Sequence, residues 1–267
     1  MTIYFLGGGN MAAAIIAGLH RTGRQNSVHV VNRGAEKREK LAALYGVQTS
    51  PTLPVLTEHD VLVLAVKPQD MKSACENIAT NGALVLSVAA GLNVNTLSRM
   101  LDGTRRIVRV MPNTPSQISM GVSGMYAAEG LSEQDKQTAD SVMQPSGMVV
   151  WLAKEDEMHS ITGISGSGSA YVFYLMNALA QAAEQQGFSS EQARSLSLAT
   201  FKGAVALAEQ SGEAFGLLQQ NVTSKGGTTA EAIRVFGEKN IAGSIAEGVA
   251  ACVARSKELG KMLEQQS

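Results

Sequence analysis

The segment Asn221 to Thr229 places hydroxyl and lysine side chains around two glycines, in an otherwise alanine-rich, helix-forming part of the chain. A glycine inside a helix costs about 1 kcal/mol relative to alanine, so the adjacent Gly226 and Gly227 predict a break. Helix-forming composition resumes at Thr228. Free backbone N–H groups and the positive end of the helix dipole would bind an anion there, and phosphate and carboxylate both fit. The alternative is an ordinary helix start capped by Ser or Thr.

A second glycine-rich segment, Gly7-Gly8-Gly9-Asn10-Met11-Ala12, follows a β-prone run that ends at Leu6. An apolar, alanine-rich helix pattern comes directly after it. A G-x-G-x-x-G/A pattern that follows a strand and opens a helix is typical of a dinucleotide-binding turn. The first glycine makes the tight turn, the second admits the pyrophosphate, and the final Ala keeps helix and strand close.

The strand Val28 to Asn32 should end where the adenosine ribose of a dinucleotide lies. A site specific for NAD usually has Asp or Glu there, which accepts a hydrogen bond from the 2′-hydroxyl. This chain has Asn32 followed by Arg33. The missing carboxylate and the added guanidinium favour a 2′-phosphate, so NADPH is the predicted cofactor, with NADH possible. The alternative is that Arg33 is a solvated side chain at a strand end.

Composition narrows the class of protein. The 267 residues carry a formal net charge of -1 without a long run of like charges, which argues against a nucleic-acid surface. Cys75 and Cys252 are far apart in sequence, which indicates a reduced, cytoplasmic protein with both thiols packed. No signal-peptide pattern precedes the first strand. No spacing typical of metal ligands occurs, so no metal site is predicted.

Residues 158–183 contain no Asp, Glu, Lys or Arg, which raises the question of a membrane span. Polar residues interrupt the segment, however, and a buried helix in a soluble core or in a subunit interface is the better prediction. We therefore expect no membrane association.

Short apolar runs alternate with helix-forming segments in the first part of the chain, and this alternation ends near residues 153–160. It predicts an α/β fold with a parallel, doubly wound sheet of the Rossmann type. The predicted strands are Ile3 to Leu6, Val28 to Asn32, Asp60 to Ala65, Ala83 to Val88, Arg106 to Met111, Val122 to Tyr126 and Met148 to Trp151. The predicted helices include Met11 to His20, Ala35 to Leu44, Met71 to Ile78 and Glu133 to Met143, the last opening with the capping-box pair Ser132 and Asp135.

The second part of the chain is predicted to be entirely helical, with helices over residues 169–186, 190–210, 214–220, 229–237 and 240–264. Gly187, Gly212 and the Gly226-Gly227 turn provide the breaks. Two of these helices carry little charge on any face, so a homodimer or a larger assembly through this part is expected. The predicted domains are an NADP-binding Rossmann domain over residues 1–155 and a helical, substrate-binding dimerisation domain over residues 156–267.

Loops at the carboxyl ends of the predicted strands should carry the ligand contacts. Small residues and prolines occupy these loops at 65–69, 89–91 and 111–115. The nicotinamide ribose could lie against their backbone, with Lys67 and Asn113 as polar contacts. Turn chemistry, with prolines that stop strands, is the alternative for any single loop. The predicted cofactor-binding residues are Leu6, Gly7, Gly8, Gly9, Asn10, Met11, Asn32, Arg33, Ala65, Val66, Lys67, Pro68, Ala89 and Asn113.

Five segments, in this order, resemble those of the pyrroline-5-carboxylate reductases, the last enzymes of proline biosynthesis. They are Gly-Gly-Gly-Asn-Met-Ala at 7–12, Ala-Val-Lys-Pro-Gln at 65–69, Met-Pro-Asn-Thr-Pro at 111–115, Gly-Ser-Gly at 166–168 with Ala-Tyr at 170–171, and Thr-Ser-x-Gly-Gly-Thr-Thr at 223–229. The resemblance spans essentially the whole chain. It implies that the N-terminal domain binds NAD(P)H, and that the helical domain dimerises and helps to form the substrate site.

The resemblance also assigns roles in the last segment. The loop is expected to hold the pyrroline carboxylate, and Thr229 to form a hydrogen bond with the ring nitrogen as the catalytic residue. The predicted substrate-binding residues are Asn221, Ser224, Lys225, Gly226, Gly227 and Thr228. Two positions depart from the family, which usually has proline at both. Ser169 is expected to start its helix with an N-cap hydroxyl, whereas Lys225 adds a cation beside the carboxylate and gives up the rigidity of proline.

The chemistry of a cyclic imine fits the residues that this chain lacks. A protonated imine is electrophilic before the enzyme acts, so its reduction mainly requires correct positioning of the hydride donor. The helix after residue 168 has no lysine where related hydroxyacid dehydrogenases carry a catalytic one, and no histidine lies in a motif loop. The predicted function is NADPH-dependent reduction of 1-pyrroline-5-carboxylate to L-proline. The alternatives are a β-hydroxyacid dehydrogenase and a non-catalytic redox sensor that binds NADP.

Overall fold

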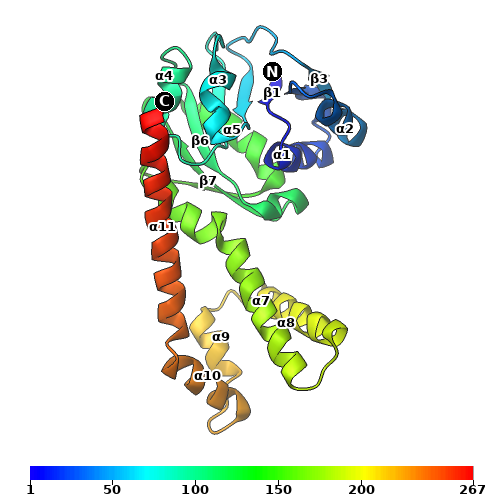
Figure 1. The fold of residues 1–267 in the computed structure, drawn as a ribbon. Helices are drawn as coiled ribbons and strands as arrows, with labels where there is room; N and C mark the ends of the chain where they lie inside the picture. The colour runs from blue at the N-terminus through cyan, green and yellow to red at the C-terminus, as the bar shows by residue number, and fades with distance from the viewer. Residues whose placement is uncertain (267) are drawn as a thin grey trace. The chain divides into compact units, whose positions relative to one another are not determined.

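The computed structural model describes residues 1–266 and contains two compact units, each of which is described separately below (Figure 1). The first unit comprises Met1–Ser167 together with Cys252–Ser267, and the second comprises Gly168–Ala251. These units divide at 167/168, and the end of the chain belongs to the first. The boundary at 155/156, drawn from the sequence, stays a prediction about functional domains.

Within residues 1–266, eight strands form one sheet in the order β3-β2-β1-β4-β5-β6-β7-β8. The strands are β1 Ile3–Leu6, β2 Val28–Val31, β3 Gln48–Ser50, β4 Val61–Leu64, β5 Leu84–Ser87, β6 Ile107–Met111, β7 Gly121–Ala127 and β8 Gly147–Trp151. From β1 the chain builds the sheet first outward to β3 and then, from β4 onward, in the other direction. The carboxyl ends of β1 and β4 therefore form a switch point, where open α/β sheets bind ligands.

The two faces of the sheet carry separate hydrophobic cores, as a doubly wound fold requires. On one face, Phe5 and Val63 pack with Ile15 and Ile16 of helix α1 (Asn10–Arg21) and with α5 (Glu133–Met143). On the other face, strand residues pack with α3 (Met71–Cys75), α4 (Val94–Met100) and Leu263 near the end of the chain. Each fully buried aliphatic side chain stabilises the fold by about 1.5–3 kcal/mol. These cores hold the carboxyl edge of the sheet rigid.

The predicted all-parallel sheet is wrong at one place, because β6 and β7 pair antiparallel. The connection between them, residues 112–120, contains only the short 3₁₀ helix Thr114–Ile118. A parallel connection needs a crossover of a dozen or more residues, and this one is too short to provide it. The other paired strands are parallel, including β7 with β8, which are joined through α5.

Several local predictions need correction. Strand β3 and helix α4 are missing from the sequence-based assignment, and α3 ends at Cys75 rather than at Ile78. The remaining predicted elements of this unit, which include α2 (Ala35–Tyr45), are present, and their ends differ from the predicted ones by at most one residue. The prediction of a packed thiol is confirmed for Cys75, whose burial raises the pKa to about 11, whereas Cys252 is only half-buried.

The second unit is helical, as predicted. Its helices are α7 Gly168–Gln185, α8 Ser190–Ser211, α9 Phe215–Asn221 and α10 Thr228–Glu238, followed by the first part of α11 (Ile241–Gln266). Helices α7 and α8 lie side by side, and Ser197 Oγ donates a hydrogen bond to the carbonyl of Met176 at 2.7 Å (Figure 1). Gly187 and Gly212 adopt positive φ between helices, which confirms the predicted breaks.

The uncharged segment 158–183 is not one buried helix. It comprises the end of α6 (Glu157–Ile161), a π-helical turn at Thr162–Gly166 and most of α7. No residue of α7 is buried, and Phe173 and Tyr174 are 64% and 74% exposed. The prediction of a buried core helix is therefore wrong for this chain, and the subunit-interface alternative stays open. Ser169 is the second residue of α7 and not its N-cap, because the helix continues from the π-helical turn.

None of the helices within residues 1–266 is long and apolar enough to cross a membrane.

Asp135 illustrates how the sheet unit satisfies a buried charge. Ser132 Oγ accepts a hydrogen bond from the Asp135 backbone N–H at 3.1 Å, but the reciprocal half of the predicted capping box is absent. The Asp135 carboxylate instead accepts two hydrogen bonds from Arg106, at 2.9 and 2.6 Å. Burial alone would raise the pKa of Asp135, but the hydrogen bonds from Arg106 and Ser132 and the charge of Arg106 outweigh it and lower the pKa.

Asp135→Asn should lower the free energy of unfolding by about 1.5–3 kcal/mol near neutral pH, because Arg106 loses its counterion. Since the folded pKa lies below the unfolded value, the carboxylate stabilises the fold above the unfolded pKa. This contribution is lost as the pH falls through the folded pKa. Urea unfolding of both proteins across pH measures the difference, which should be constant near neutrality and vanish in acid. A difference that persists unchanged in acid would contradict this role.

Candidate functional site

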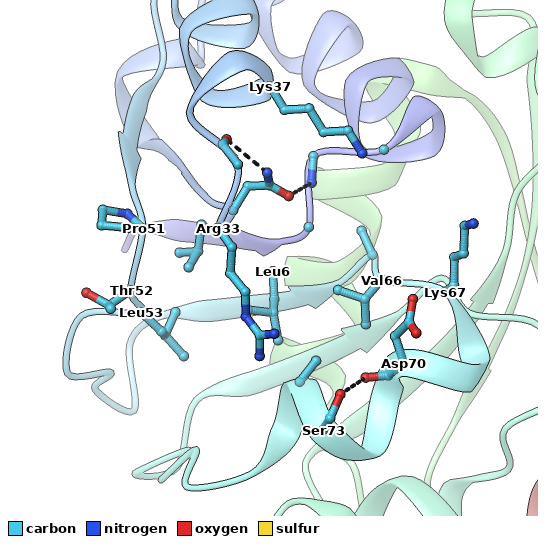
Figure 2. A pocket seen from close by; sticks show the side chains of 18 of the residues that line it. Leu6, Arg33, Lys37, Pro51, Thr52, Leu53, Val66, Lys67, Asp70 and Ser73 are labelled. Carbon is cyan, nitrogen blue, oxygen red and sulfur yellow. Dashed lines mark hydrogen bonds between the residues drawn. The ribbon is translucent and has the colours of Figure 1, made fainter.

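A cleft of 710 Å³ lies at the switch point of the sheet, along the carboxyl ends of β1, β2 and β4 (Figure 2). Residues from the glycine turn, from the end of β2 and from the loop after β4 line it together. Of the predicted cofactor residues, it brings together Leu6, Gly7, Gly8, Gly9, Asn32, Arg33, Ala65, Val66 and Lys67. The cleft is thus built by the segments that the sequence assigned to a dinucleotide.

The glycine turn after β1 approaches the loop after β4 very closely. Gly7 has φ of +106°, and a Cβ at this position would lie 2.8 Å from the carbonyl oxygen of Ala65. A Cβ on Gly8 would lie 3.0 Å from a methyl group of Leu41 in α2. Both the positive φ and the missing side chain are therefore required at Gly7, as predicted for the first glycine of the motif. Ala12 is fully buried in the core between helix and sheet.

Helix α1 begins at Asn10, directly after Gly7, Gly8 and Gly9, which line the cleft. Its N-cap is Gly9, which has no side chain to accept a hydrogen bond from the first N–H groups of the helix. Free N–H groups and the positive end of the helix dipole make such a terminus a binding site for a phosphate. The residues thus fit the pyrophosphate of a dinucleotide, and the cleft beside them extends towards the end of β2.

Asn32 and Arg38 fix the loop at the end of β2. The Asn32 side chain accepts a hydrogen bond from the Gly8 N–H at 3.4 Å and donates one to the carbonyl of Gly34 at 3.1 Å (Figure 2). Arg38 donates to the backbone carbonyls of Asn32 and Arg33, at 2.6 and 2.8 Å. These bonds leave the exposed guanidinium of Arg33 free to point into the cleft, as Figure 2 shows.

Lys37 is a cation of the cleft that the sequence analysis missed. It extends from α2 towards the glycine turn, and with Arg33 and Lys67 it gives the lining three basic side chains (Figure 2). The acidic lining residues, Asp70 and Glu76, lie on the opposite side, after β4. The end of β2 therefore offers positive charge without a carboxylate, which suits a 2′-phosphate. No motif of the sequence marks Lys37, because its place in the cleft depends on how α2 lies against the glycine turn.

The outer wall of the cleft is formed by residues 51–53, which follow the unpredicted strand β3. His29 supports this wall through Ser50, whose Oγ lies 2.8 Å from the His29 ring and donates to the carbonyl of Thr52 at 2.6 Å. Burial lowers the pKa of His29, with a smaller opposing effect from Gln48. His29 is therefore neutral at physiological pH and acts as a packed residue of the wall.

Five predicted cofactor residues do not line this cleft. Asn10 lines a neighbouring groove between α1 and α2, Met11 is half-buried in α1, and Pro68 begins the 3₁₀ turn after β4. Ala89 is 7% exposed after β5. Asn113 is also buried, and its amide donates to the carbonyl of Ser165 and accepts from the N–H of Val122. Cofactor contacts from these residues stay a prediction.

The predicted substrate segment lies in the second unit and has the expected local structure. Asn221 is the last residue of α9, Gly226 has φ of +72°, and α10 begins at Thr228 with Gly227 as an N-cap that lacks a side chain. A Cβ on Gly227 would contact Ser224 Oγ, so a side chain at this position would require the serine side chain to move. Thr229 lies in the first turn of α10 and is half-buried, as expected, whereas Thr228 is exposed.

Ser224 and Lys225 both have exposed side chains in the turn before α10. The turn is closed by a hydrogen bond of 3.0 Å from the N–H of Gly227 to the carbonyl of Ser224. In the part of the chain that the structure describes, no carboxylate forms an ion pair with Lys225. The turn therefore presents N–H groups and one free ammonium group at the start of a helix, an arrangement suited to a carboxylate.

Both the N-terminal and the C-terminal part of this chain are similar in sequence to known protein families. A family model described as "Pyrroline-5-carboxylate reductase dimerisation" matches residues 155–259, and one described as "NADP oxidoreductase coenzyme F420-dependent" matches residues 2–91. Among curated relatives, the pyrroline-5-carboxylate reductase of Vibrio alginolyticus is 38% identical over 97% of this chain and 98% of its own length. That of Pseudomonas aeruginosa is 36% identical over 98% of each chain.

Solved structures agree with these relatives. A pyrroline-5-carboxylate reductase from Coxiella burnetii has a TM-score of 0.90 and 38% identity, covering 97% of this chain and 98% of that chain. The pyrroline carboxylate reductase of Plasmodium falciparum, solved with NADP bound, has a TM-score of 0.83 and 26% identity, with the same coverage. Near-complete overlap with these proteins, together with the five sequence segments, shows that this chain belongs to the pyrroline-5-carboxylate reductase family.

Proposed function

We propose that this protein reduces 1-pyrroline-5-carboxylate to L-proline with NADPH. The observation that carries the proposal is the turn at Ser224–Gly227 directly before α10, in which Gly226 has a φ of +72° that favours glycine and Gly227 is an N-cap without a side chain. It occurs in a chain whose full-length relatives are named pyrroline-5-carboxylate reductases. The direct test is loss of nicotinamide absorbance when enzyme, NADPH and pyrroline-5-carboxylate are mixed, with proline as the product.

NADPH, when bound, supplies the hydride, and the protein supplies the geometry. The N–H groups at the start of α1 would bind the pyrophosphate, and Arg33 with Lys37 would bind the 2′-phosphate. Asn32 and Arg38 hold the loop that carries Arg33. Ala65, Val66 and Lys67 follow β4 and would lie along the middle of the cofactor. These contacts fix the dinucleotide across the switch point, so that its reactive ring has one orientation.

The turn before α10 would bind the substrate carboxylate through backbone N–H groups and Lys225. Thr229 lies in the first helical turn that follows, close in sequence to this anion site. Its hydroxyl would accept a hydrogen bond from the iminium N–H and donate one to the product amine. Because the iminium carbon is electrophilic without further activation, orientation by these groups is the main requirement.

The exposed apolar surface of the second unit supports assembly. Phe173, Tyr174, Val205, Leu207 and Phe215 are each more than half exposed in the single chain. Apolar side chains gathered in this way mark an interaction site. The family model that covers this part concerns dimerisation, which indicates a dimer or a higher oligomer. We propose a homodimer through the C-terminal helices, and a cytoplasmic location for the enzyme.

The alternatives are less well supported. A β-hydroxyacid dehydrogenase would need a general acid for a carbonyl, and α7 contains no lysine where such enzymes carry one. A non-catalytic NADP sensor would have no need for the strained glycine turn before α10. Oxidation of hydroxyacids would favour the first, and tight NADPH binding without turnover would favour the second.

Arg33→Ala should raise the Michaelis constant for NADPH about tenfold or more and leave that for NADH nearly unchanged, because a charge-assisted hydrogen bond contributes about 1.5–3 kcal/mol. Steady-state kinetics with both cofactors measures this. Lys40→Ala is the matched control, since Lys40 is an exposed cation on α2 outside the cleft lining. An equal loss with both cofactors would mean that Arg33 has a structural role.

Thr229→Val keeps the β-branched shape and removes only the hydroxyl, so folding and NADPH affinity should change little. Loss of a hydrogen bond to a charged group predicts a fall of about ten- to a hundredfold in kcat/KM for the imine. Thr228→Val is the control, because Thr228 is offset by about 100° on the helix and is exposed. Full activity of Thr229→Val with an impaired Thr228→Val would show that the wrong threonine was chosen. Full activity of both variants would mean that neither hydroxyl orients the substrate and that backbone groups do so.

Lys225→Pro should weaken binding of pyrroline-5-carboxylate, although it restores the residue usual in the family. The reason is loss of the free ammonium group beside the carboxylate site. Salt should weaken binding to the wild type more than to the variant, because charge interactions at the surface are screened over about 10 Å at 0.1 M. Titrations at several salt concentrations measure both effects. Equal affinities and equal salt dependence would place Lys225 in solvent, with no part in binding.

A further inference from the structure

The Glu155 carboxylate connects three parts of the sheet unit that are distant in sequence. Glu155 lies just before α6, and its Oε1 accepts a hydrogen bond from the backbone N–H of Val94 at 2.7 Å. The same oxygen accepts one from the Arg109 guanidinium at 2.9 Å. One carboxylate oxygen therefore joins the start of α4 to the middle of β6.

The buried guanidinium of Arg109 needs the Glu155 carboxylate to neutralise its charge. The Arg109 side chain is only 7% exposed, and its Nε has no hydrogen-bond partner among the described residues. Within residues 1–266, Glu155 is the one carboxylate that forms an ion pair with Arg109. A buried charge that loses its partner destabilises a protein strongly, so any test must separate this effect from a role in catalysis.

The two groups that Glu155 joins lie next to loops at the carboxyl edge of the sheet. Val94 is the first residue of α4 and directly follows the loop 88–93, which comes after β5 and contains Ala89. Arg109 lies opposite Ser87 in the register of β5 and β6, two residues before β6 ends. The loop after β6 contains Asn113. Ala89 and Asn113 are the two predicted cofactor residues on this side of the sheet, away from the adenosine side of the cleft.

The loop 88–93 packs into the sheet unit through Ala89 and Leu92, which are 7% and 1% exposed. A cavity of 230 Å³ lies beside it, and Gly91, Asn93 and Arg109 are among the residues that line it. Gly91 adopts φ of +82°, and the loop contains no regular secondary structure. The hydrogen bond from Val94 to Glu155 adds to this packing and links the end of the loop to β6 through Arg109. The Asn93 side chain also donates a hydrogen bond to Glu264 Oε1 at 2.5 Å.

We propose that Glu155 is a positioning residue for hydride transfer, which fixes the loop 88–93 against β6 and thereby the nicotinamide end of the cofactor. This proposal rests on the proposed function. Glu155 contacts none of the residues at the end of β2 that would bind the adenosine 2′-phosphate. Its removal should therefore affect the two ends of the dinucleotide differently, which a general loss of structure would not do.

Glu155→Ala should lower kcat for the imine about ten- to a hundredfold, as expected for a displacement near 1 Å of reacting groups. The dissociation constant of adenosine 2′,5′-bisphosphate, measured by calorimetry, should stay within about twofold, because this probe occupies only the adenosine side. The dissociation constant of NADPH, measured by its fluorescence, should rise at least about fivefold through loss of oriented contacts at the nicotinamide. Equal weakening of both ligands would contradict the proposal.

Glu157→Ala is the matched control. Glu157 is the first residue of α6, two residues after Glu155, and it is half-buried. Its carboxylate accepts hydrogen bonds from the N–H groups of Ala153 and Lys154, at 2.9 and 3.2 Å. It joins neither β6 nor the loop 88–93. Glu157→Ala should leave kcat and both dissociation constants unchanged. A loss in this control as large as that in Glu155→Ala would show a general effect of α6 and overturn the proposal.

A double variant separates positioning from charge neutralisation. Arg109→Met added to Glu155→Ala removes the unpaired buried charge, so the free energy of unfolding should recover while kcat stays low, because Val94 still lacks its acceptor. Recovery of kcat together with stability would show that Glu155 only neutralises Arg109. If the wild type does not reduce pyrroline-5-carboxylate, the proposed function fails. The ratio of the NADPH and bisphosphate dissociation constants then still decides the inference about Glu155.

Discussion

The cofactor cleft depends on a backbone approach at the carboxyl edge of the sheet that only glycine permits. At Gly7 the chain leaves β1 with positive φ and passes so close to Ala65 that a methyl group would clash with its carbonyl oxygen. This approach lets α1 start at the switch point between β1 and β4, directly after the glycines that line the cleft. The remaining features of the cleft are arranged around it, including the fixed loop that carries Arg33.

The two units differ in how they accommodate charged and apolar side chains. The sheet unit satisfies its charges internally, as Asp135 with Arg106 and Glu155 with Arg109 show. The helical unit instead exposes large apolar side chains, because a stack of a few helices cannot bury them alone. The family model that matches this part of the chain concerns dimerisation, which agrees with an interaction surface here.

The sequence predicted most of the parallel sheet and the C-terminal helices, because apolar runs and glycine breaks are local signals. It predicted the strand β7 but missed its antiparallel direction, which follows from the length of the connection and not from its composition. It missed β3 because Gln48, Thr49 and Ser50 are polar and lie at the edge of the sheet. In the site, the glycine turn and Arg33 were predictable from a motif. Lys37 and Glu155 were not, since their roles depend on which distant backbone each side chain meets.

This chain reduces pyrroline-5-carboxylate by hydride transfer from NADPH to the imine carbon. Reaction with NADPH deuterated at the transferable position of the nicotinamide shows where the hydride goes, when the product is examined by mass spectrometry and NMR. We expect L-proline that carries one deuterium, located at C5. Proline without the label, or NADPH consumption without proline, would contradict it.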